Sequence, residues 1–338
     1  MNPSSSRTTL LGVLAALMVL CQIGGTAAAA VDVTIKEWDV PTFPHDPAFA
    51  PDGSAWYTGQ RGHVLGRLDP ATGQLKQFPL SPGSGPHGLV ADRQGNIWYT
   101  GNAAAHIGKL NPKTGEVIQY KMPDPAARDP HSLVFDQKGT LWFTVQGGNF
   151  VGKLDPATGA ITLKQPSASR SLPYGIAISS KGVPFFDLFG TNKIGSIDPQ
   201  TMVITEYPLP EGARPRRIAI TSDDVIWYTD YARGFLGRLD PGTKQVKEFA
   251  SPGGARSRPY GITAGGDGSL WYSESGVEPN TVVRFDPKTL TMQNWPIPSG
   301  GGVVRHMVAA PDGTVWLACS GVNKIARVTI KEAAAATK

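Results

Sequence analysis

Seven aromatic residues recur along the chain at intervals of 42 to 45 residues, and this period constrains the fold more than any other feature. They are Trp56, Trp98, Trp142, Phe185, Trp227, Trp271 and Trp316. Each lies in a similar short phrase, such as Ile-Trp-Tyr-Thr at 97–100 and at 226–229. The chain therefore repeats one structural unit about seven times, and we expect the aromatic residues to pack in the core between units.

Each unit contains four short apolar runs separated by turns, which is typical of β-strands. Examples are Pro-Tyr-Gly-Ile at 173–176, Ile-Trp-Tyr-Thr at 97–100, Ile-Gly-Lys-Leu at 107–110 and Glu-Tyr-Pro-Leu-Pro at 206–210. In the recurring turn Asp-Pro-x-Thr-Gly, as at 69–73, Asp binds the backbone, Pro fixes φ and Gly accepts a positive φ. The 40 glycines and 29 prolines also oppose long helices. These features predict an all-β, seven-bladed β-propeller with four strands in each blade.

The two ends of the repeat region complement each other. The seventh unit ends without its fourth run, whereas residues 36–41, Lys-Glu-Trp-Asp-Val-Pro, resemble the fourth run at 293–298 of the sixth unit. We therefore expect the N-terminal strand to complete the last blade and close the ring, which removes an open sheet edge. Residues 31–338 would form a single domain.

Residues 1–30 have the composition of a secretory signal peptide. Arg7 is their only charged residue, an apolar run spans 10–20, and Ala28 to Ala30 offer a cleavage site before Val31. The run is too short to cross a bilayer, so we expect a periplasmic or secreted protein without a membrane anchor. Leu20 precedes Cys21 where a lipoprotein would have a small residue. Cys319 is then the only cysteine of the mature chain, which excludes an internal disulfide.

The position eleven residues before each aromatic should open on the central channel, because the innermost strand of each blade begins there. Its residues are His45, His87, His131, Tyr174, Arg216, Tyr260 and Arg305. Three imidazoles from adjacent blades suit a divalent metal ion or proton transfer, or they simply line a polar channel. We predict His45, His87 and His131 as metal ligands. Tyr174, Arg216, Tyr260 and Arg305 are predicted substrate contacts. The remaining histidines His63 and His106 are expected at the surface.

Two further residues are candidates for catalysis. His306 adjoins the channel position of the last blade, and Glu274 lies three residues after Trp271. Either side chain can act as a base, and Glu274 can also bind a hard cation or pair with an arginine. The loops before the innermost strands carry eight arginines, namely Arg128, Arg170, Arg214, Arg216, Arg217, Arg256, Arg258 and Arg305. Such a rim would attract an anionic ligand, and we include Arg258 among the substrate contacts.

The repeat phrases at 173–176, 97–100, 107–110 and 206–210 resemble those of the virginiamycin B lyase family, and the resemblance covers residues 34–330. It implies a seven-bladed propeller that opens a cyclic depsipeptide antibiotic by cleaving an ester through elimination, with magnesium bound. The site matches only in part. Tyr260 stands at the family's substrate-contacting histidine, and Arg305, followed by His306, stands at its catalytic histidine. Val303 stands at its metal-binding glutamate.

These observations leave three functions open. The first is an exported, lyase-like enzyme whose base is His306 or the histidine cluster, with Glu274 assisting a magnesium ion. The second is a propeller without enzymatic activity that holds an anionic ligand or a protein on its arginine rim. The third is a lactonase-type hydrolase with a metal in the channel. We expect a monomer with a small-molecule or peptide ligand in the channel and no nucleic-acid partner, because exported chains rarely meet nucleic acid.

Overall fold

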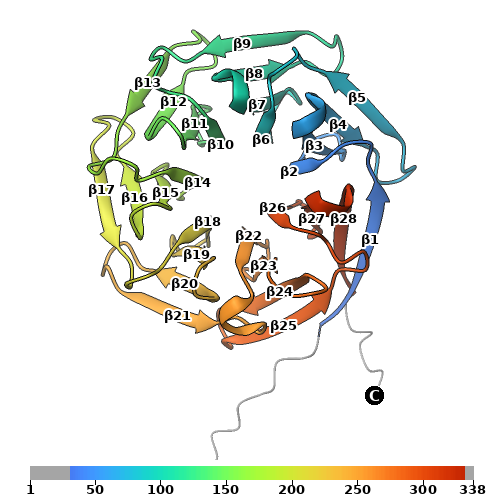
Figure 1. Cartoon of the computed structure of the whole chain (residues 1–338), viewed down its shortest axis with the longest axis vertical. Helices are drawn as coiled ribbons and strands as arrows, with labels where there is room; N and C mark the ends of the chain where they lie inside the picture. The colour runs from blue at the N-terminus through green and yellow to red at the C-terminus, as the bar shows by residue number, and fades with distance from the viewer. Residues whose placement is uncertain (1–30, 332–338) are drawn as a thin grey trace, which may run out of the picture.

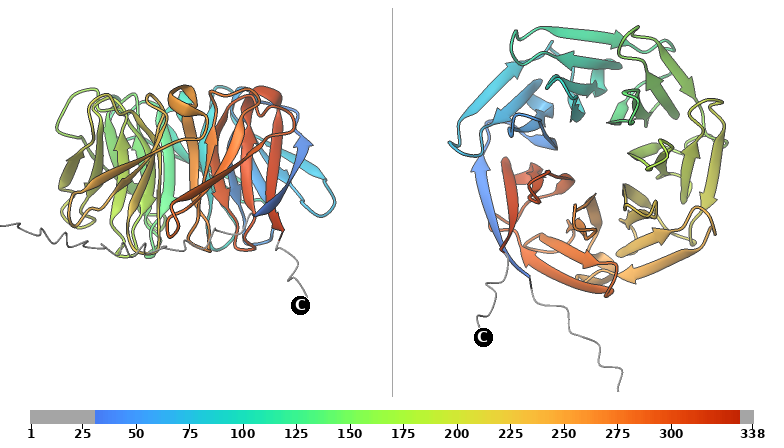
Figure 2. Two further views of the ribbon diagram at one scale, coloured as in Figure 1. Left: turned by 90° about the horizontal axis from the view of Figure 1, so that it is seen from below. Right: turned by 180° about the vertical axis from the view of Figure 1, so that it is seen from behind.

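The computed structural model describes residues 31–331 and shows seven four-stranded antiparallel sheets arranged as a ring around a central axis (Figure 1). We use the term channel for the region around this axis, which the innermost strands of the blades surround. Figure 2 shows that the ring is a flat cylinder, with the strands of each blade running between its two faces. The predicted all-β, seven-bladed propeller is confirmed. The predicted signal peptide lies outside the described residues. No helix within 31–331 has the length and apolar character needed to span a bilayer.

The strands of every blade follow one another from the channel outward. The innermost strands are β2 (Pro44–Phe49), β6 (Pro86–Ala91), β10 (Pro130–Phe135), β14 (Pro173–Ile178), β18 (Pro215–Ile220), β22 (Pro259–Ala264) and β26 (Val304–Ala309). The second strands, which contain the repeated aromatic, are β3 (Ala55–Gly59), β7 (Ile97–Gly101), β11 (Leu141–Val145), β15 (Pro184–Leu188), β19 (Ile226–Asp230), β23 (Leu270–Glu274) and β27 (Val315–Cys319).

The outer half of each blade is more exposed. The third strands are β4 (Val64–Leu68), β8 (His106–Leu110), β12 (Phe150–Leu154), β16 (Lys193–Ile197), β20 (Phe235–Leu239), β24 (Thr281–Asp286) and β28 (Lys324–Lys331). The outermost strands are β5 (Leu75–Pro79), β9 (Val117–Lys121), β13 (Ile161–Lys164), β17 (Ile204–Pro208), β21 (Val246–Ala250), β25 (Thr291–Pro296) and β1 (Asp32–Asp39). Four single 3-10 turns complete the described chain: η1 (Gln60–Gly62), η2 (Asn102–Ala104), η3 (Gly254–Arg256) and η4 (Ser320–Val322).

The N-terminal strand closes the ring, as the sequence predicts. β1 pairs antiparallel with β28 over eight residues, from Asp32 opposite Lys331 to Asp39 opposite Lys324. The Trp38 ring also stacks on Trp316 with a centroid distance of 5.5 Å. The last blade therefore combines the first strand of the described chain with its last three, and the edge of β28 is covered.

The repeated aromatics form the core, and small polar groups join the blades. Trp56, Trp98, Trp142, Trp271 and Trp316 are each 1% exposed. Two residues after the first of them, Thr58 Oγ1 donates to the carbonyl of His87 in the next blade at 2.7 Å and accepts the N–H of Asp46 at 3.0 Å. Thr100, Thr144, Thr229 and Ser273 make the equivalent bond to the following blade. The repeated hydroxyl thus fixes the innermost strands, which line the channel.

Every innermost strand has an irregular register near its start. In β2 the pairing with β3 shifts between Pro44 and Pro47, and the other six strands show the same shift. In a regular strand, successive side chains point to opposite faces, but a bulge re-aims one of them. Here two consecutive residues of a strand reach the channel and form two layers. The upper layer is His45, His87, His131, Tyr174, Arg216, Tyr260 and Arg305, and the lower layer is Asp46, Gly88, Ser132, Gly175, Arg217, Gly261 and His306.

Candidate functional site in the central channel

Three histidines and a tyrosine of the upper layer pack against one another, with their rings tilted, along one part of the channel wall. Ring centroids are 3.8 Å apart for His45 and His87, 3.8 Å for His87 and His131, and 3.7 Å for His131 and Tyr174. The structure therefore brings the three predicted histidines together. Each ring sits at the start of a different innermost strand, so the spacing of the blades sets the spacing of the rings.

These imidazoles are held neutral. Burial lowers the pKa of His45, although Asp46 acts in the opposite direction. Burial, together with the charge of neighbouring histidines and of Arg217, places the pKa of His87 and of His131 well below the ordinary value. Neutral imidazoles in contact avoid the repulsion that two imidazolium ions would suffer. This part of the channel is thus polar and aromatic, without charge at neutral pH.

The opposite part of the upper layer is cationic. Arg216 Nη2 donates to Tyr260 Oη at 2.9 Å, and Arg305 Nη1 donates to the same oxygen at 3.4 Å. Tyr174 Oη lies 2.5 Å from Tyr260 Oη. The Arg216 guanidinium also lies within 5 Å of the ring centres of Tyr174, Phe189, Tyr231 and Tyr260. Within residues 31–331, no carboxylate forms an ion pair with Arg216 or Arg305.

The lower layer is closed by one buried ion pair. Arg217 Nη2 donates to both carboxylate oxygens of Asp46 at 2.9 and 3.0 Å, and Nη1 donates to Ser132 Oγ at 2.7 Å. Its Nε donates to the carbonyl of Arg305 at 3.2 Å. The side chain of β18 therefore reaches strands β2, β10 and β26 across the channel. Burial acts to raise the pKa of Asp46, but Arg217 and the nearby histidines hold it well below the ordinary value.

His306 lies at this lower level. With Asp46, Ser132 and Arg217 it lines a cavity of about 30 Å³, which is the size of a single water molecule. Burial and the charge of Arg217 lower the pKa of His306 to about 3, and its Nδ1 has no hydrogen-bond partner among the described residues. A base with so low a pKa takes up a proton poorly, so the predicted catalytic role of His306 gains no support from this placement.

Glu274, the second predicted catalytic residue, accepts three hydrogen bonds, none of them from the two channel layers. It is the last residue of β23 and is fully buried. Its oxygens accept hydrogen bonds from Ser251 Oγ at 2.6 Å, Gly253 N at 2.6 Å and Thr281 Oγ1 at 2.5 Å. These bonds join β23 to β24 and to the segment after β21. No hydrogen bond within 31–331 connects the carboxylate to either channel layer.

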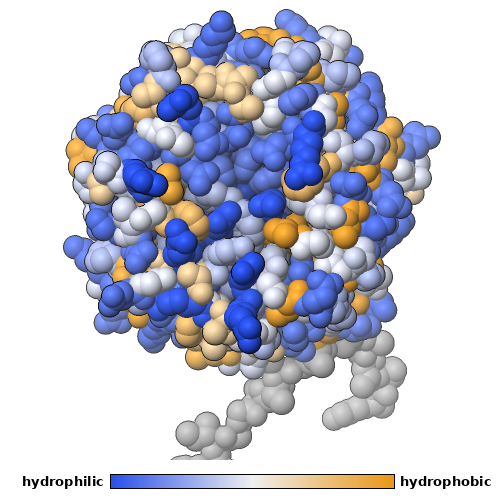
Figure 3. All heavy atoms as spheres, in the orientation of Figure 1, coloured by the Kyte–Doolittle hydropathy of each residue, from blue (hydrophilic) through white to orange (hydrophobic). Residues whose placement is uncertain are grey.

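The rim of the channel is rich in arginine, although one of the eight arginines predicted there lies elsewhere. Five of the eight predicted rim arginines are exposed: Arg128, Arg170, Arg214, Arg256 and Arg258. Arg216 and Arg305 are half-buried in the upper layer, and Arg217 is 2% exposed, so its assignment to the rim was wrong. Arg258 lies 5.8 Å above the Tyr231 ring, which in turn packs on Tyr260. Figure 3 shows strongly hydrophilic side chains around the centre of one face of the ring.

The two histidines outside the channel are less exposed than the sequence predicts. His106 begins β8, is 3% exposed and packs edge-on against Tyr99 with a centroid distance of 5.7 Å. His63 is half-buried, and its Nδ1 accepts the N–H of Gly85 at 3.1 Å. The prediction failed because His106 packs against the ring of Tyr99 in its own blade, and His63 contacts the segment that precedes β6 of the next blade.

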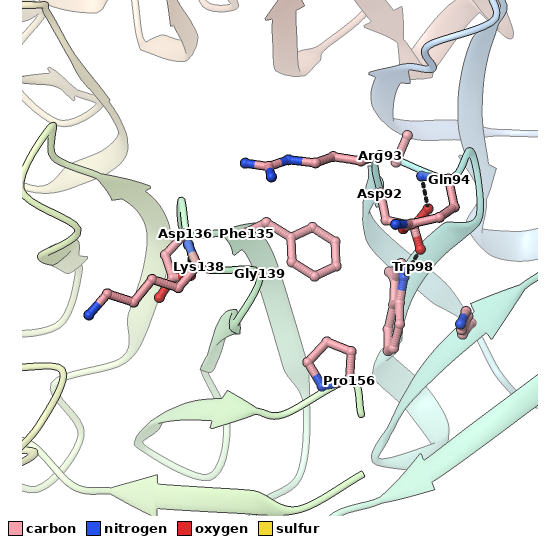
Figure 4. Close-up of a pocket in the computed structure, with 11 residues that line it drawn as sticks. Asp92, Arg93, Gln94, Trp98, Phe135, Asp136, Lys138, Gly139 and Pro156 are labelled. Carbon is pink, nitrogen blue, oxygen red and sulfur yellow. Dashed lines mark hydrogen bonds between the residues drawn. The ribbon is translucent and has the colours of Figure 1, made fainter. Parts of the chain in front are cut away.

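A separate groove lies between the second and third blades (Figure 4) and holds about 350 Å³. Asp92 Oδ2 accepts the indole N–H of Trp98 at 2.9 Å there, while Arg93 and Lys138 extend away from the indole. Grooves of about 350 to 700 Å³ also contact Trp56, Trp142 and Trp227 at other blades. Because the groove recurs with the repeat, we attribute it to blade packing and assign it no ligand.

The fold and the site define a seven-bladed propeller whose channel is lined by imidazoles in ring-to-ring contact on one side and by arginines and tyrosines on the other. The profile of the virginiamycin B lyase family matches residues 21–186 and 166–337, and the chain belongs to this family.

Solved structures agree with this assignment. A streptogramin B lyase is 27% identical with a TM-score of 0.81, and the match covers 88% of this chain and 98% of that one. Virginiamycin B lyase from Staphylococcus aureus is 25% identical with a TM-score of 0.80, covering 89% and 100%. A catalytically inactive variant of the S. aureus enzyme with quinupristin is 25% identical with a TM-score of 0.79, and the match covers 89% of this chain and 100% of that one. No curated protein sequence matches the chain.

The channel residues do not fit the magnesium ion that the family resemblance implies. Within 31–331, one group of potential ligand atoms lies within 4.8 Å of one another, from His45, Asp46 and His87. Magnesium prefers several oxygen ligands, whereas this group offers one carboxylate that Arg217 already binds through both oxygens. The guanidinium groups of the channel would also repel a divalent cation. The metal site predicted at His45, His87 and His131 stays a prediction, and we derive no reaction step through it.

Proposed function

We propose that this member of the virginiamycin B lyase family binds an organic anion at the mouth of its channel, between Arg216 and Arg305. One observation carries the proposal: two neighbouring guanidinium groups meet at the Tyr260 hydroxyl, and neither has a carboxylate partner within 31–331. The Nε atoms of both arginines are also buried without a hydrogen-bond partner. A carboxylate is planar and accepts paired hydrogen bonds from guanidinium, so it would satisfy these donors.

The surroundings of Arg216 favour an anion that also carries an apolar or aromatic part. The rings of Phe189 and Tyr231 lie 4.6 and 4.9 Å from its guanidinium carbon, and Arg214 packs over the same Phe189 ring at 4.7 Å. The exposed arginines of the rim add a long-range attraction for negative charge. We therefore choose benzoate, a carboxylate on an aromatic ring, as the probe for this site.

Replacing Arg216 by glutamine should weaken benzoate binding at least tenfold, a loss of about 1.4 kcal/mol, because the charge and the paired donors are both removed. Isothermal titration calorimetry measures this directly. The matched control is Arg128→Gln, since Arg128 is an exposed rim arginine with no contact to the upper layer, and its affinity for benzoate should stay within a factor of two. Equal losses in the two variants would show that only the general charge of the rim attracts the anion.

Elimination is a second candidate function, and family membership favours it. The substrate would then be an ester of a cyclic depsipeptide. Because magnesium does not fit the channel residues, protein groups would stabilise the charge that develops during the reaction. Incubation with quinupristin followed by mass spectrometry tests this candidate. Elimination opens the ring without a change of mass, whereas a lactonase-type hydrolysis adds one water. Antibiotic that stays cyclic both in EDTA and with added magnesium would exclude the candidate.

The proposal places the chain in the periplasm or outside the cell, as a monomer. The location rests on the composition of residues 1–30, with the apolar run at 10–20 and the small residues at 28–30. Cys319 is fully buried and forms no disulfide within residues 31–331, so its thiol is shielded from oxidants. The pairing of β1 with β28 supplies the closure that a disulfide gives to smaller exported domains.

A further inference from the structure

Asp187 of β15 stands at a position where other blades carry a threonine. In those blades the hydroxyl accepts an N–H from the lower layer of its own blade and donates to the carbonyl of an upper-layer residue in the next blade. The fourth blade has a carboxyl group at this position, and the upper-layer residue of the next blade is Arg216. The threonines and the upper-layer residues that accept their bonds are Thr58 with His87, Thr100 with His131, Thr144 with Tyr174, and Thr229 with Tyr260.

Asp187 keeps only one half of this hydrogen-bond pattern. Its Oδ2 accepts the N–H of Gly175 at 3.0 Å, as the threonines accept the equivalent N–H. The residue is fully buried, and its Oδ1 has no hydrogen-bond partner among the described residues. An ionised carboxylate can only accept hydrogen bonds, whereas a protonated carboxyl can donate one to a carbonyl as the threonines do. The missing bond is therefore the one that a proton on Oδ1 would make to the carbonyl of Arg216.

The two arginines that face Asp187 from β18 bind other groups. Arg216 Nη2 donates to Tyr260 Oη, and Arg217 Nη2 donates to both carboxylate oxygens of Asp46. Their charges act to lower the pKa of Asp187, but burial outweighs them and raises this pKa well above the ordinary value. A buried carboxylate without a hydrogen-bonded partner is costly, so the neutral form is favoured.

The titratable side chains of the other adjacent strands are directed elsewhere. Tyr174 of β14 meets the hydroxyl of Tyr260 at 2.5 Å, and Lys193 of β16 pairs with Glu206 at 2.7 Å. Neither forms a hydrogen bond with Asp187 within residues 31–331. These strands therefore supply no cation that would hold the carboxyl in its ionised form.

We propose that Asp187 is a positioning residue of the anion site, whose proton ties the carbonyl of Arg216 to the fourth blade and so holds the Arg216 guanidinium in place. The inference rests on the proposed function, because Arg216 is one of the two arginines that bind the anion there. When the proton passes to water, the carbonyl loses its donor and a negative charge remains beside β18. This charge attracts the Arg216 guanidinium and competes with the bound carboxylate for it.

The expected pH dependence has a definite sign. Because burial raises the pKa of Asp187, the folded chain keeps this proton above the ordinary carboxyl range and loses it as the pH rises through the raised value. Affinity for an anion is thus full below that value and falls above it. Arg216, Arg217 and Arg305 lower the pKa of Tyr260, so this hydroxyl also loses its proton at high pH. Only a variant of Asp187 separates the two effects.

Asp187→Asn is the direct test, because its amide can accept the Gly175 N–H and donate to the Arg216 carbonyl at every pH. Isothermal titration calorimetry with benzoate, which stays ionised throughout, should give both proteins affinities within about threefold at about pH 6.5. At about pH 9 the unaltered chain should bind at least about tenfold more weakly than the variant. Asp187→Thr installs the side chain of the other blades and should behave as Asp187→Asn does.

The matched control is Thr100→Val, which removes the equivalent bond in the second blade, where the acceptor is the carbonyl of His131. Its benzoate affinity should follow the pH as that of the unaltered chain does. Thermal melting shows whether each variant is folded. Loss of the pH dependence in Thr100→Val would show that any broken bond between blades has this effect, and would overturn the specific role of Asp187.

Infrared difference spectroscopy of the unaltered chain against Asp187→Asn detects the proton without any ligand. The unaltered chain should show the carbonyl band of a protonated carboxylic acid at about pH 6.5, and the variant should lack it. Absence of this band would overturn the protonated state of Asp187. If the band is present but the two proteins keep one ratio of benzoate affinities at both pH values, the positioning role is wrong. If no protein binds benzoate, the anion-binding function is wrong and the coupling fails with it, whereas the band still decides the protonation.

Discussion

Replacing Arg217 by methionine is expected to destabilise the folded chain by about 3–5 kcal/mol, because the substitution leaves the Asp46 carboxylate buried and uncompensated. Arg217 and Asp46 have exposed side-chain fractions of only 3% and 2%, so water cannot take the place of the lost guanidinium. The same substitution also removes the hydrogen bonds to Ser132 and to the Arg305 carbonyl, which tie β18 to β10 and β26. Urea denaturation measures the loss as a shift in the midpoint at constant slope.

A surface ion pair supplies the matched control. Arg67 and Asp52 approach to 3.0 Å with side chains 35% and 56% exposed, and Arg67→Met should cost less than about 1 kcal/mol. The double variant Asp46→Leu with Arg217→Met removes both charges and should recover much of the stability lost by Arg217→Met alone. The account of the buried pair fails if Arg217→Met costs no more than Arg67→Met, or if the double variant recovers nothing.

Acidification from about pH 7.5 to about pH 5.5 should cost the folded chain several kcal/mol, and buried histidines are the reason. The pKa values of four channel histidines are lowered by burial, namely His45, His87, His131 and His306. In the unfolded chain they take up protons below about pH 6.5. In the folded chain His87, His131 and His306 stay neutral in this range, and His45 takes up its proton at a lower pH than it does in the unfolded chain. Their contribution is thus present above the unfolded pKa and is lost as the pH falls, by about 1.4 kcal/mol per histidine for each unit below it.

One buried carboxyl acts in the opposite direction. Burial raises the pKa of Asp187 well above the ordinary value, so the folded chain holds a proton there that the unfolded chain has lost, and this contribution fades as the pH rises. Denaturation midpoints measured across the pH range give the net slope. His87→Gln should reduce the acid-side slope by about one proton, and Asp187→Asn should increase it. Stability that is unchanged between pH 7.5 and 5.5 would contradict the neutral state assigned to the channel histidines.

The fold could be predicted almost completely from the repeat. Spacing of the aromatic residues gives the number of blades, and the unmatched phrase at 36–41 gives the closing strand, which β1 confirms by pairing with β28. Both depend on local patterns that every unit repeats, so each unit supports the interpretation of the others. The buried position of His106 was missed because the sequence of its unit does not indicate that the imidazole packs against the ring of Tyr99 in the same blade.

The channel could be predicted only in its upper layer. The histidines, Tyr174 and Tyr260 were placed correctly, whereas Asp46 and Arg217 were missed as a pair. A regular strand would point the residue after each upper-layer position away from the channel, and the bulge that overrides this alternation is not visible from residue types alone. One signal was present: the lower-layer position is glycine in three units and polar or charged in the other four. The four units that lack this glycine carry the polar and charged side chains of the lower layer, and among these Arg217 binds Asp46 and Ser132 across the channel.

A crystal structure of the mature chain with 4-bromobenzoate and manganese, a magnesium substitute, tests the central claim most directly, because anomalous scattering locates both bromine and metal. The account predicts the carboxylate within hydrogen-bond distance of Arg216 and Arg305, with no metal in the channel and Arg217 still paired with Asp46. A manganese ion bound by His45, Asp46 and His87 with Arg217 displaced would contradict it. So would a bromobenzoate found only outside the channel.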